Sequence, residues 1–306
     1  MDAHLEARVR PRTILTYKRA ALPFCQWVLA HFFALETSEH WDDAIMLYKQ
    51  DPEVNLTKNQ FSVLMTAVQF YFPRFRGQLH LCRAAADGWS LLEPVHHTVP
   101  LGQTPSKLLA CHWAARSMQR LGLAAVLQSH TGLRPSELLG LLPEHVLFPS
   151  DTGGDPLTAP VLLALGVKQG TKVKRPQVAK IPADYKELIS LLWLCRQHTA
   201  PGQRLFPFSL STWRTELRSL DELLGFRAGW TPHSGRSGFA TDSRIAGKSF
   251  EEVREAGRWQ ADASLRTYLD IAAAATVLVQ SRLAGRSSAL AWADQFWHQY
   301  FVSWNW

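Results

Sequence analysis

Residues 231–247, TPHSGRSGFATDSRIAG, hold the pattern that decides how the rest of the sequence is interpreted. Thr231 is a suitable N-cap and Pro232 is tolerated in a first turn, so this stretch predicts the start of a helix. His233 and Arg236 are three positions apart, which places both side chains on one helical face and within reach of the same object. For His233 alone, a buried structural role is the alternative. The pair indicates a functional site.

A second stretch, HTGLRPSELLGL at residues 130–141, places another arginine at a predicted helix start. Pro135 fits the first turn, where the N–H that proline lacks would have no partner in any case. Arg134 would then lie beside unpaired backbone N–H groups, and these groups with its guanidinium would form an anion site. Glu137 can hold that guanidinium through an ion pair. A solvated arginine at a helix start is the alternative.

Two aromatic residues follow at defined distances. Ser249 and Glu252 form a capping-box pattern, which predicts a helix that ends at Gly257. Trp259 comes two positions after that glycine, and Tyr268 lies nine residues further on. Taken alone, Tyr268 is an ordinary half-buried tyrosine.

Taken in order, these residues resemble the tyrosine recombinase and phage integrase family. The family pattern is an arginine after TG-L, an HxxR doublet, a His or Trp, and a nucleophilic tyrosine; here these are Arg134, His233 with Arg236, Trp259 and Tyr268. The distances of 23 residues from Arg236 to Trp259 and of nine from Trp259 to Tyr268 also match what the family leads us to expect. Chance is a poor explanation for this agreement.

The resemblance implies a site-specific DNA recombinase that works by transesterification without a metal or other cofactor. Tyr268 would attack a DNA phosphate and leave a 3'-phosphotyrosyl link. Because tyrosine is mostly protonated at neutral pH, fixed donors must meet the charge that builds on the phosphate and the phenol. Arg134 and Arg236 would clamp the phosphate from two sides. His233 would move the proton, and Trp259 would donate its indole N–H.

The family also uses a lysine on a β-hairpin to protonate the leaving hydroxyl. The basic run VKQGTKVKRPQVAKIP, residues 167–182, offers several candidates. We expect Lys172 to take this role, because GTK precedes the predicted turn; Lys174 and then Lys168 are the alternatives. The whole run, including Lys168, Lys174 and Arg175, can instead hold the DNA backbone electrostatically. The two interpretations are compatible.

Two positions depart from the family pattern. Ser237 stands where many members have a second histidine, and Arg258 lies between the glycine and the aromatic residue in GRW. This departure keeps open a transposon-derived protein that binds DNA without cutting it. A type IB topoisomerase or a hairpin resolvase, which share the tyrosine chemistry, is the enzymatic alternative.

Composition agrees with a partner that is a polyanion. The chain has 306 residues, a net charge of +7 and a pI near 9.4, which favours binding to phosphates, although an ordinary basic enzyme would look the same. The dispersed cysteines predict neither a zinc site nor a disulfide framework. We expect double-stranded DNA as the partner, no membrane span, and a location inside the cell with DNA: the nucleus in a eukaryote, the cytoplasm or nucleoid in a bacterium. Composition also suggests a GC-rich genome and a mobile element as the source.

The apolar pattern predicts a mainly α protein with a small β-sheet (α+β), in two domains at residues 1–98 and 99–306. By resemblance the first is a helical DNA-clamping domain and the second is catalytic. We expect a linker at residues 86–105, helices at residues 13–33, 41–49, 57–73, 104–131 and 134–146, and paired strands within residues 161–168 and 177–182.

The C-terminal segment, residues 289–306, is rich in aromatic side chains. Trp292, Phe296, Tyr300 and Trp304 are four apart and predict one helical stripe that must be covered, with Trp297 and Phe301 alongside it. Relatives often dock such a helix into a neighbouring subunit, which implies a homotetramer on DNA. The alternative is that the helix folds back on its own domain.

Overall fold

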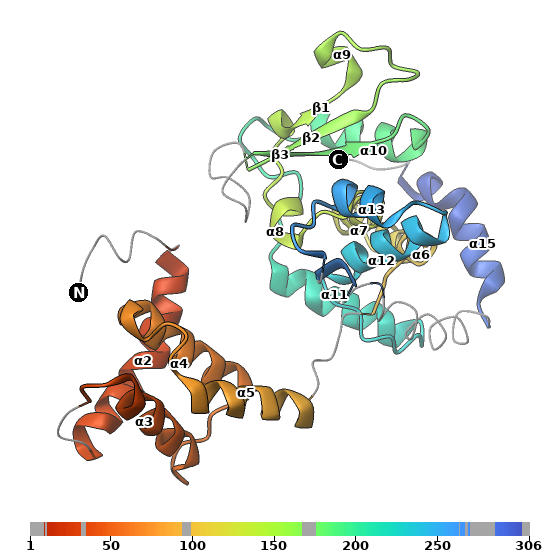
Figure 1. Ribbon diagram of the computed structural model, residues 1–306. Helices are drawn as coiled ribbons and strands as arrows, with labels where there is room; N and C mark the ends of the chain where they lie inside the picture. The colour runs from red at the N-terminus through yellow and green to blue at the C-terminus, as the bar shows by residue number, and fades with distance from the viewer. Residues whose placement is uncertain are drawn as a thin grey trace. The chain divides into compact units, whose positions relative to one another are not determined.

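The computed structural model describes residues 9, 11–31, 35–93, 99–166, 176–262, 264–266, 269 and 285–301. The chain divides into two compact units, Met1–His96 and His97–Trp306 (Figure 1). From the sequence we predict a boundary between residues 98 and 99. Both units are mainly helical and the second holds a small antiparallel sheet, which confirms the predicted fold class.

The N-terminal unit is a set of helices around an apolar core that includes Phe24, Ile45 and Phe61, all fully buried. Thr57 and Gln60 form a capping box at the start of α4, as the threonine predicts. The described elements of this unit are α2 Pro11–His31, α3 Ser38–Gln50, α4 Lys58–Tyr71, the 3-10 turn η1 Pro73–Phe75 and α5 His80–Leu92.

Helix α5 contradicts the predicted linker, because residues 86–92 belong to it. No side chain next to α5 caps its first turn. The carboxylate of Asp42, which is buried on α3, instead accepts the N–H groups of Leu81 at 2.7 Å and Cys82 at 2.9 Å. Its start therefore depends on a residue about forty positions earlier, which a search for local caps does not find.

The C-terminal unit is organised around α6 Gln103–Ala115 and the buried helix α7 Gln119–Thr131. The single helix expected over residues 104–131 is wrong. Ser117 adopts a left-handed φ of 58°, and the N–H of Met118 returns to the carbonyl of Trp113 at 2.7 Å, so the chain reverses there. The two helices then pack closely, because a Cβ on Gly122 would lie 3.0 Å from the Cα of Ala110.

A three-stranded antiparallel sheet in the order β1-β2-β3 lies in this unit. Its strands are β1 Val146–Leu147, β2 Val161–Leu165 and β3 Gln177–Ile181, with Leu163 opposite Ala179. Alternate residues of β2 are buried, which is the period expected for a strand with one face on the core. The predicted strand pair is therefore present; the basic turn between the strands, residues 167–175, lies outside the described residues.

The described ranges of this unit hold further elements (Figure 1). They are η2 Pro143–His145, α9 Pro149–Thr152, α10 Lys186–Gln197, α11 Leu210–Leu223, α12 Ser234–Ile245, α13 Phe250–Gly257, α15 Ser287–Phe296 and η3 Trp297–Phe301. Ser249 and Glu252 form the predicted capping box at α13. None of the helices in the described ranges is long and apolar enough to cross a membrane.

The C-terminal segment folds back on its own unit along a different stripe from the one predicted. Ala293, Trp297 and Phe301 are buried in the core, while Trp292 is 42% and Tyr300 40% exposed. The stripe is therefore displaced by one residue, because Ala293 is small enough to let α15 approach α6 closely. Trp304, the last residue of the predicted stripe, lies outside the described residues.

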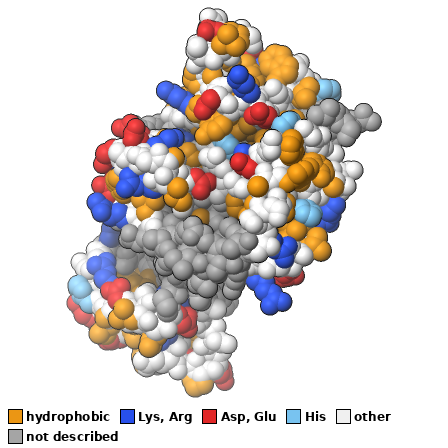
Figure 2. Space-filling view, turned by 90° about the vertical axis from the view of Figure 1, so that its right-hand side faces the viewer, with side chains coloured by type: hydrophobic (Ala, Val, Ile, Leu, Met, Phe, Trp, Pro, Cys, Tyr) orange, Lys and Arg blue, Asp and Glu red, His pale blue; other side chains and the backbone are white. Residues whose placement is uncertain are grey.

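The face of the molecule seen in Figure 2 shows hydrophobic side chains among both acidic and basic ones.

Candidate functional site

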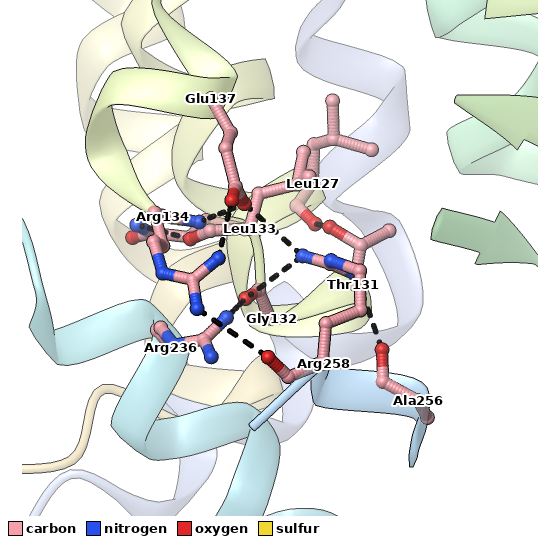
Figure 3. A network of polar contacts seen from close by, with 10 residues as sticks. Leu127, Thr131, Gly132, Leu133, Arg134, Glu137, Arg236, Ala256 and Arg258 are labelled. Atoms are coloured by element: carbon pink, nitrogen blue, oxygen red, sulfur yellow. Dashed lines mark hydrogen bonds and ion pairs between the residues drawn. The ribbon is translucent and has the colours of Figure 1, made fainter. Parts of the chain in front are cut away.

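Helix α7 ends at a glycine where several segments meet (Figure 3). Gly132 has a left-handed φ of 61°, and a Cβ there would lie 2.6 Å from the ring of Phe239, so both conformation and space require glycine. Its carbonyl accepts hydrogen bonds from Arg236 Nη1 and, at 3.5 Å, from Arg258 Nη2. The C-terminal end of a helix carries partial negative charge, which favours this gathering of guanidinium groups.

Arg134 follows this turn and is held by Glu137. The carboxylate accepts the Arg134 backbone N–H at 2.8 Å and its Nη1 at 2.5 Å, so the ion pair expected from the spacing is present. Helix α8, Pro135–Leu138, is only one turn long, and the prediction of a helix over residues 134–146 is wrong. Glu137 accepts the N–H of Arg134, so this N–H is not open to an anion, and the anion site expected at the helix start stays a prediction.

His233 and Arg236 lie at the start of α12 but differ in exposure. The helix begins at Ser234, so His233 occupies the N-cap position and the prediction of Thr231 as the N-cap is wrong. Ser234 Oγ accepts the N–H of Thr231 at 2.9 Å. Arg236 is only 3% exposed and reaches inward to the Gly132 carbonyl. His233 is exposed. The two side chains of the HxxR doublet thus start from one turn and meet different surroundings.

The indole ring of Trp259 packs against the guanidinium group of Arg236. The guanidinium carbon lies 4.0 Å from the centroid of the indole ring, a cation–π contact that also shields the arginine from water. The ring of Phe239 is stacked with the indole at 6.4 Å between centroids. A Cβ on Gly257 would lie 1.5 Å from the indole, so only glycine allows Trp259 this position. Trp259 and Arg236, 23 residues apart, thus form one packed unit.

Gln128 joins the two arginine-bearing segments, a role that the sequence did not indicate. This buried side chain on α7 donates through Nε2 to the carbonyl of Leu133 at 3.0 Å and to that of Pro232 at 2.9 Å. A Cβ on Gly235 would lie 2.4 Å from its Oε1. Leu133 and Pro232, which directly precede Arg134 and His233 in the sequence, are therefore held by the same side-chain amide. A lone glutamine in a helical pattern gives no signal for this role.

Arg258 adds a third guanidinium to the network (Figure 3). It has a left-handed φ of 58° and is 8% exposed, and its Nη2 contacts Glu137 Oε2 at 3.2 Å. Burial by itself would raise the pKa of Glu137, but the charges of Arg258 and Arg134 and the hydrogen bonds from Arg134 hold that pKa below its usual value. Burial lowers the pKa of Arg258, although the guanidinium stays charged at neutral pH because its reference pKa is so high.

Several predicted site residues lie outside the described residues: Lys168, Lys172, Lys174, Arg175 and Tyr268. Among those described, the fold brings Arg134, Glu137, Arg236 and Trp259 together, with Arg258 as a partner that the sequence indicated only as a departure from the family pattern. Within the described ranges, no group of three or more His, Cys, Asp or Glu side chains could hold a metal ion.

Comparison with known proteins identifies the fold. The XerH site-specific recombinase, bound to its palindromic difH substrate after cleavage, superposes with a TM-score of 0.60 at 16% identity, over 90% of this chain and 79% of that chain. XerA recombinase gives a TM-score of 0.44 at 17% identity, over 92% of this chain and 94% of that chain. The Tn1549 transposon integrase in complex with a circular intermediate DNA gives 0.47 at 14%, over 81% and 94%.

Sequence comparison adds no relative. A scan against models of known protein families finds no match, and neither does a search of curated protein sequences. The structural likeness to XerH nevertheless confirms the fold expected from the motifs, that of the tyrosine recombinases and integrases.

Proposed function

From the fold shared with the XerH site-specific recombinase, we propose that this chain is a site-specific DNA recombinase that cuts and rejoins strands by transesterification. One observation carries the proposal: the guanidinium groups of Arg134 and Arg236, which come from separate motifs, end in one hydrogen-bonded network around Gly132 and Glu137. Two fixed cations at one place are what a phosphodiester needs when charge develops on it during attack.

Each residue has a proposed task. Arg134 and Arg236 bind the oxygens of the scissile phosphate and stabilise the charge of the transition state. His233, exposed at the start of the same helix as Arg236, moves the proton. Trp259 holds the guanidinium group of Arg236 through their cation–π contact and supplies its indole N–H to the site.

The nucleophile and the general acid complete the chemistry. Tyr268 attacks the phosphorus, its phenolic oxygen forms the new P–O bond, and the 5'-oxygen of the next nucleotide leaves, giving a 3'-phosphotyrosyl link. Lys172 protonates the departing oxygen, with Lys174 and Lys168 as the alternatives. Resealing reverses the step, so the reaction conserves the energy of the broken bond and consumes no cofactor.

Double-stranded DNA is the proposed partner. The related XerH structure contains its difH substrate, and the present chain carries a net charge of +7. We further propose that the N-terminal unit and the basic segment around Lys168, Lys174 and Arg175 contact the DNA backbone. Four copies would assemble on two duplexes, inside the cell and with DNA. The exposed face of α15 and η3, which includes Trp292 and Tyr300, offers a surface for that assembly.

A suicide substrate tests the proposal. DNA that binds the full chain is selected from a random pool, and the recovered site is prepared with a nick that lets the cleaved fragment diffuse away. We expect a denaturation-resistant protein–DNA adduct with the wild type and none with Tyr268→Phe. Tyr185→Phe makes the same chemical change on a partly buried tyrosine of the C-terminal unit that has no proposed role in the reaction, and it should form the adduct normally.

The outcomes separate the alternatives. Wild-type protein that binds the selected DNA but never forms the adduct would refute an enzymatic function and leave a DNA-binding protein. An adduct that persists with Tyr268→Phe would refute the assignment of the nucleophile. Tetramers on DNA would favour a recombinase over a topoisomerase.

A further inference from the structure

Arg258 has a backbone conformation that is unfavourable for residues other than glycine. A left-handed φ of 58° in a residue other than glycine costs roughly 1–2 kcal/mol, and helix α13 would end as well on glycine. The side chain is also nearly inaccessible, and its buried Nε bonds to none of the described residues. Such a costly arrangement persists only where the surrounding contacts enforce it.

Three of the four contacts of Arg258 go to Arg134 or to the residues that hold the two clamp arginines, Glu137 and Gly132 (Figure 3). Arg258 Nη2 reaches Glu137 at 3.2 Å and the Gly132 carbonyl at 3.5 Å, and Nη1 reaches Ala256 O at 3.1 Å. The backbone carbonyl of Arg258 accepts a hydrogen bond from Arg134 Nη2 at 3.3 Å. The residue therefore contacts Arg134 directly and contacts Arg236 through their shared acceptor, Gly132.

The contacts of Arg258 change the balance of charge around Arg134. Glu137 would neutralise Arg134 if it had no other cation, because the two form a close ion pair at 2.5 Å in a largely buried setting. Arg258 shares that carboxylate, so these two guanidinium groups have one carboxylate between them. One positive charge of the pair is then left over, which matches the one additional negative charge that a phosphodiester gains under attack.

We propose that Arg258 is a positioning residue for this reaction: by holding Glu137 and Gly132 at once, it fixes Arg134 and leaves the charge of Arg134 available to the scissile phosphate. The inference rests on the proposed function. We assign Arg258 no contact with the substrate, because both of its Nη atoms already bond within the protein, to Ala256, Gly132 and Glu137. The planar fork allows this: Nη2 contacts Glu137 and Gly132 while Nη1 donates to Ala256 O, and a single ammonium group cannot occupy both positions.

Arg258→Gly tests the inference with the least disturbance to the backbone, because glycine adopts a left-handed φ freely and retains the carbonyl that Arg134 uses. Arg227→Gly is a matched control: Arg227 also has a left-handed φ, 48°, but is exposed in the loop after α11. We expect adduct formation on the nicked substrate to slow about tenfold to a hundredfold with Arg258→Gly. DNA affinity should stay within about threefold in both variants, because no phosphate contact is lost.

A double substitution distinguishes positioning from a merely structural role. In the Arg258→Gly protein, Glu137 is left to neutralise Arg134, so adding Glu137→Gln should restore at least part of the rate, a coupling that a double-mutant cycle measures. A merely structural residue would give the opposite result, a further loss. Arg258→Lys retains the charge and should react at a rate between those of the glycine variant and the wild type.

These experiments test the proposed function and the role of Arg258 separately. If the wild type forms no adduct, the proposed function fails before any variant is compared. If it does form the adduct, three results would overturn the role of Arg258: wild-type speed in Arg258→Gly, additive loss in the double variant, or full activity in Arg258→Lys. Should the glycine variant not fold, the lysine variant still tests the need for the fork.

Discussion

Gly238 is the position where the structure makes the sharpest stability prediction. It lies inside α12, where replacement of glycine by alanine ordinarily stabilises a helix by roughly 1 kcal/mol. A Cβ at Gly238, however, would lie 2.0 Å from the carbonyl oxygen of Leu101, 2.3 Å from its carbonyl carbon and 2.8 Å from the N of Gly102. The substitution Gly238→Ala therefore sets helix propensity against a clash with backbone.

The cost of the clash should clearly exceed the gain in helix propensity. Carbon contacts are optimal at about 3.5–4.0 Å, so the segment must move by more than about 1 Å, and backbone atoms cannot rotate away. Overpacking costs about 1–3 kcal/mol. The movement also strains the bond from Leu101 N to Ser234 O, 2.9 Å, and the bond from Gln103 N to Asp242 Oδ2, 2.6 Å, each worth about 1 kcal/mol. After the helix gain is subtracted, we expect a loss of roughly 2 kcal/mol or more.

Calorimetry of the full chain measures this effect. The melting temperature of the C-terminal unit should fall by on the order of 5–10 °C in Gly238→Ala. Gly88→Ala is the matched control, since Gly88 lies in α5 and a Cβ added there would have no atom within 4 Å; it should stabilise the N-terminal unit by about 0.5–1 kcal/mol. A melting temperature that is unchanged or higher in Gly238→Ala, with the control behaving as expected, would refute the reasoning.

Two further predictions concern buried polar groups. Gln128→Leu leaves the carbonyls of Leu133 and Pro232 without their buried donor and should lower the free energy of unfolding by about 2 kcal/mol, measured by urea denaturation; unchanged stability would show that the amide is dispensable. Burial raises the pKa of Asp242, against the hydrogen bond from Gln103 N–H. Because the folded-state pKa lies above the unfolded one, stability should fall as pH rises from about 4 through the folded-state pKa. Asp242→Asn, which can still accept that N–H, should remove the fall; parallel pH profiles of the two proteins would contradict this.

Local signals predicted much of the fold. The cap at Thr57, the capping box of Ser249 with Glu252 and the alternation in Val161–Leu165 all act between residues a few positions apart, and each element is present. The break after α6 was missed because no glycine or proline marks it, and Ser117 takes the left-handed conformation instead. Helix α5 was missed because its cap, Asp42, comes from another helix.

The sequence likewise predicted some residues of the candidate site and missed others. The motif residues Arg134, Arg236 and Trp259 could be named from type and spacing, since their chemistry resembles that of a known family. The role of Arg258 could not, because nothing in the sequence tells which carboxylate a buried guanidinium will share. Likewise, no spacing relates Gln128 to the carbonyl of Pro232, which is 104 positions away.

The C-terminal helix shows the difference most simply. Its sequence determined an amphipathic aromatic helix, because the period of the apolar residues is a local property of the backbone. It could not determine which of two adjacent apolar stripes is buried, because both would remove similar area from water. Tertiary packing decided this: Ala293 lets α15 lie close to α6, the ion pair of Lys107 with Asp294 at 2.8 Å fixes its rotation, and Trp297 enters the core.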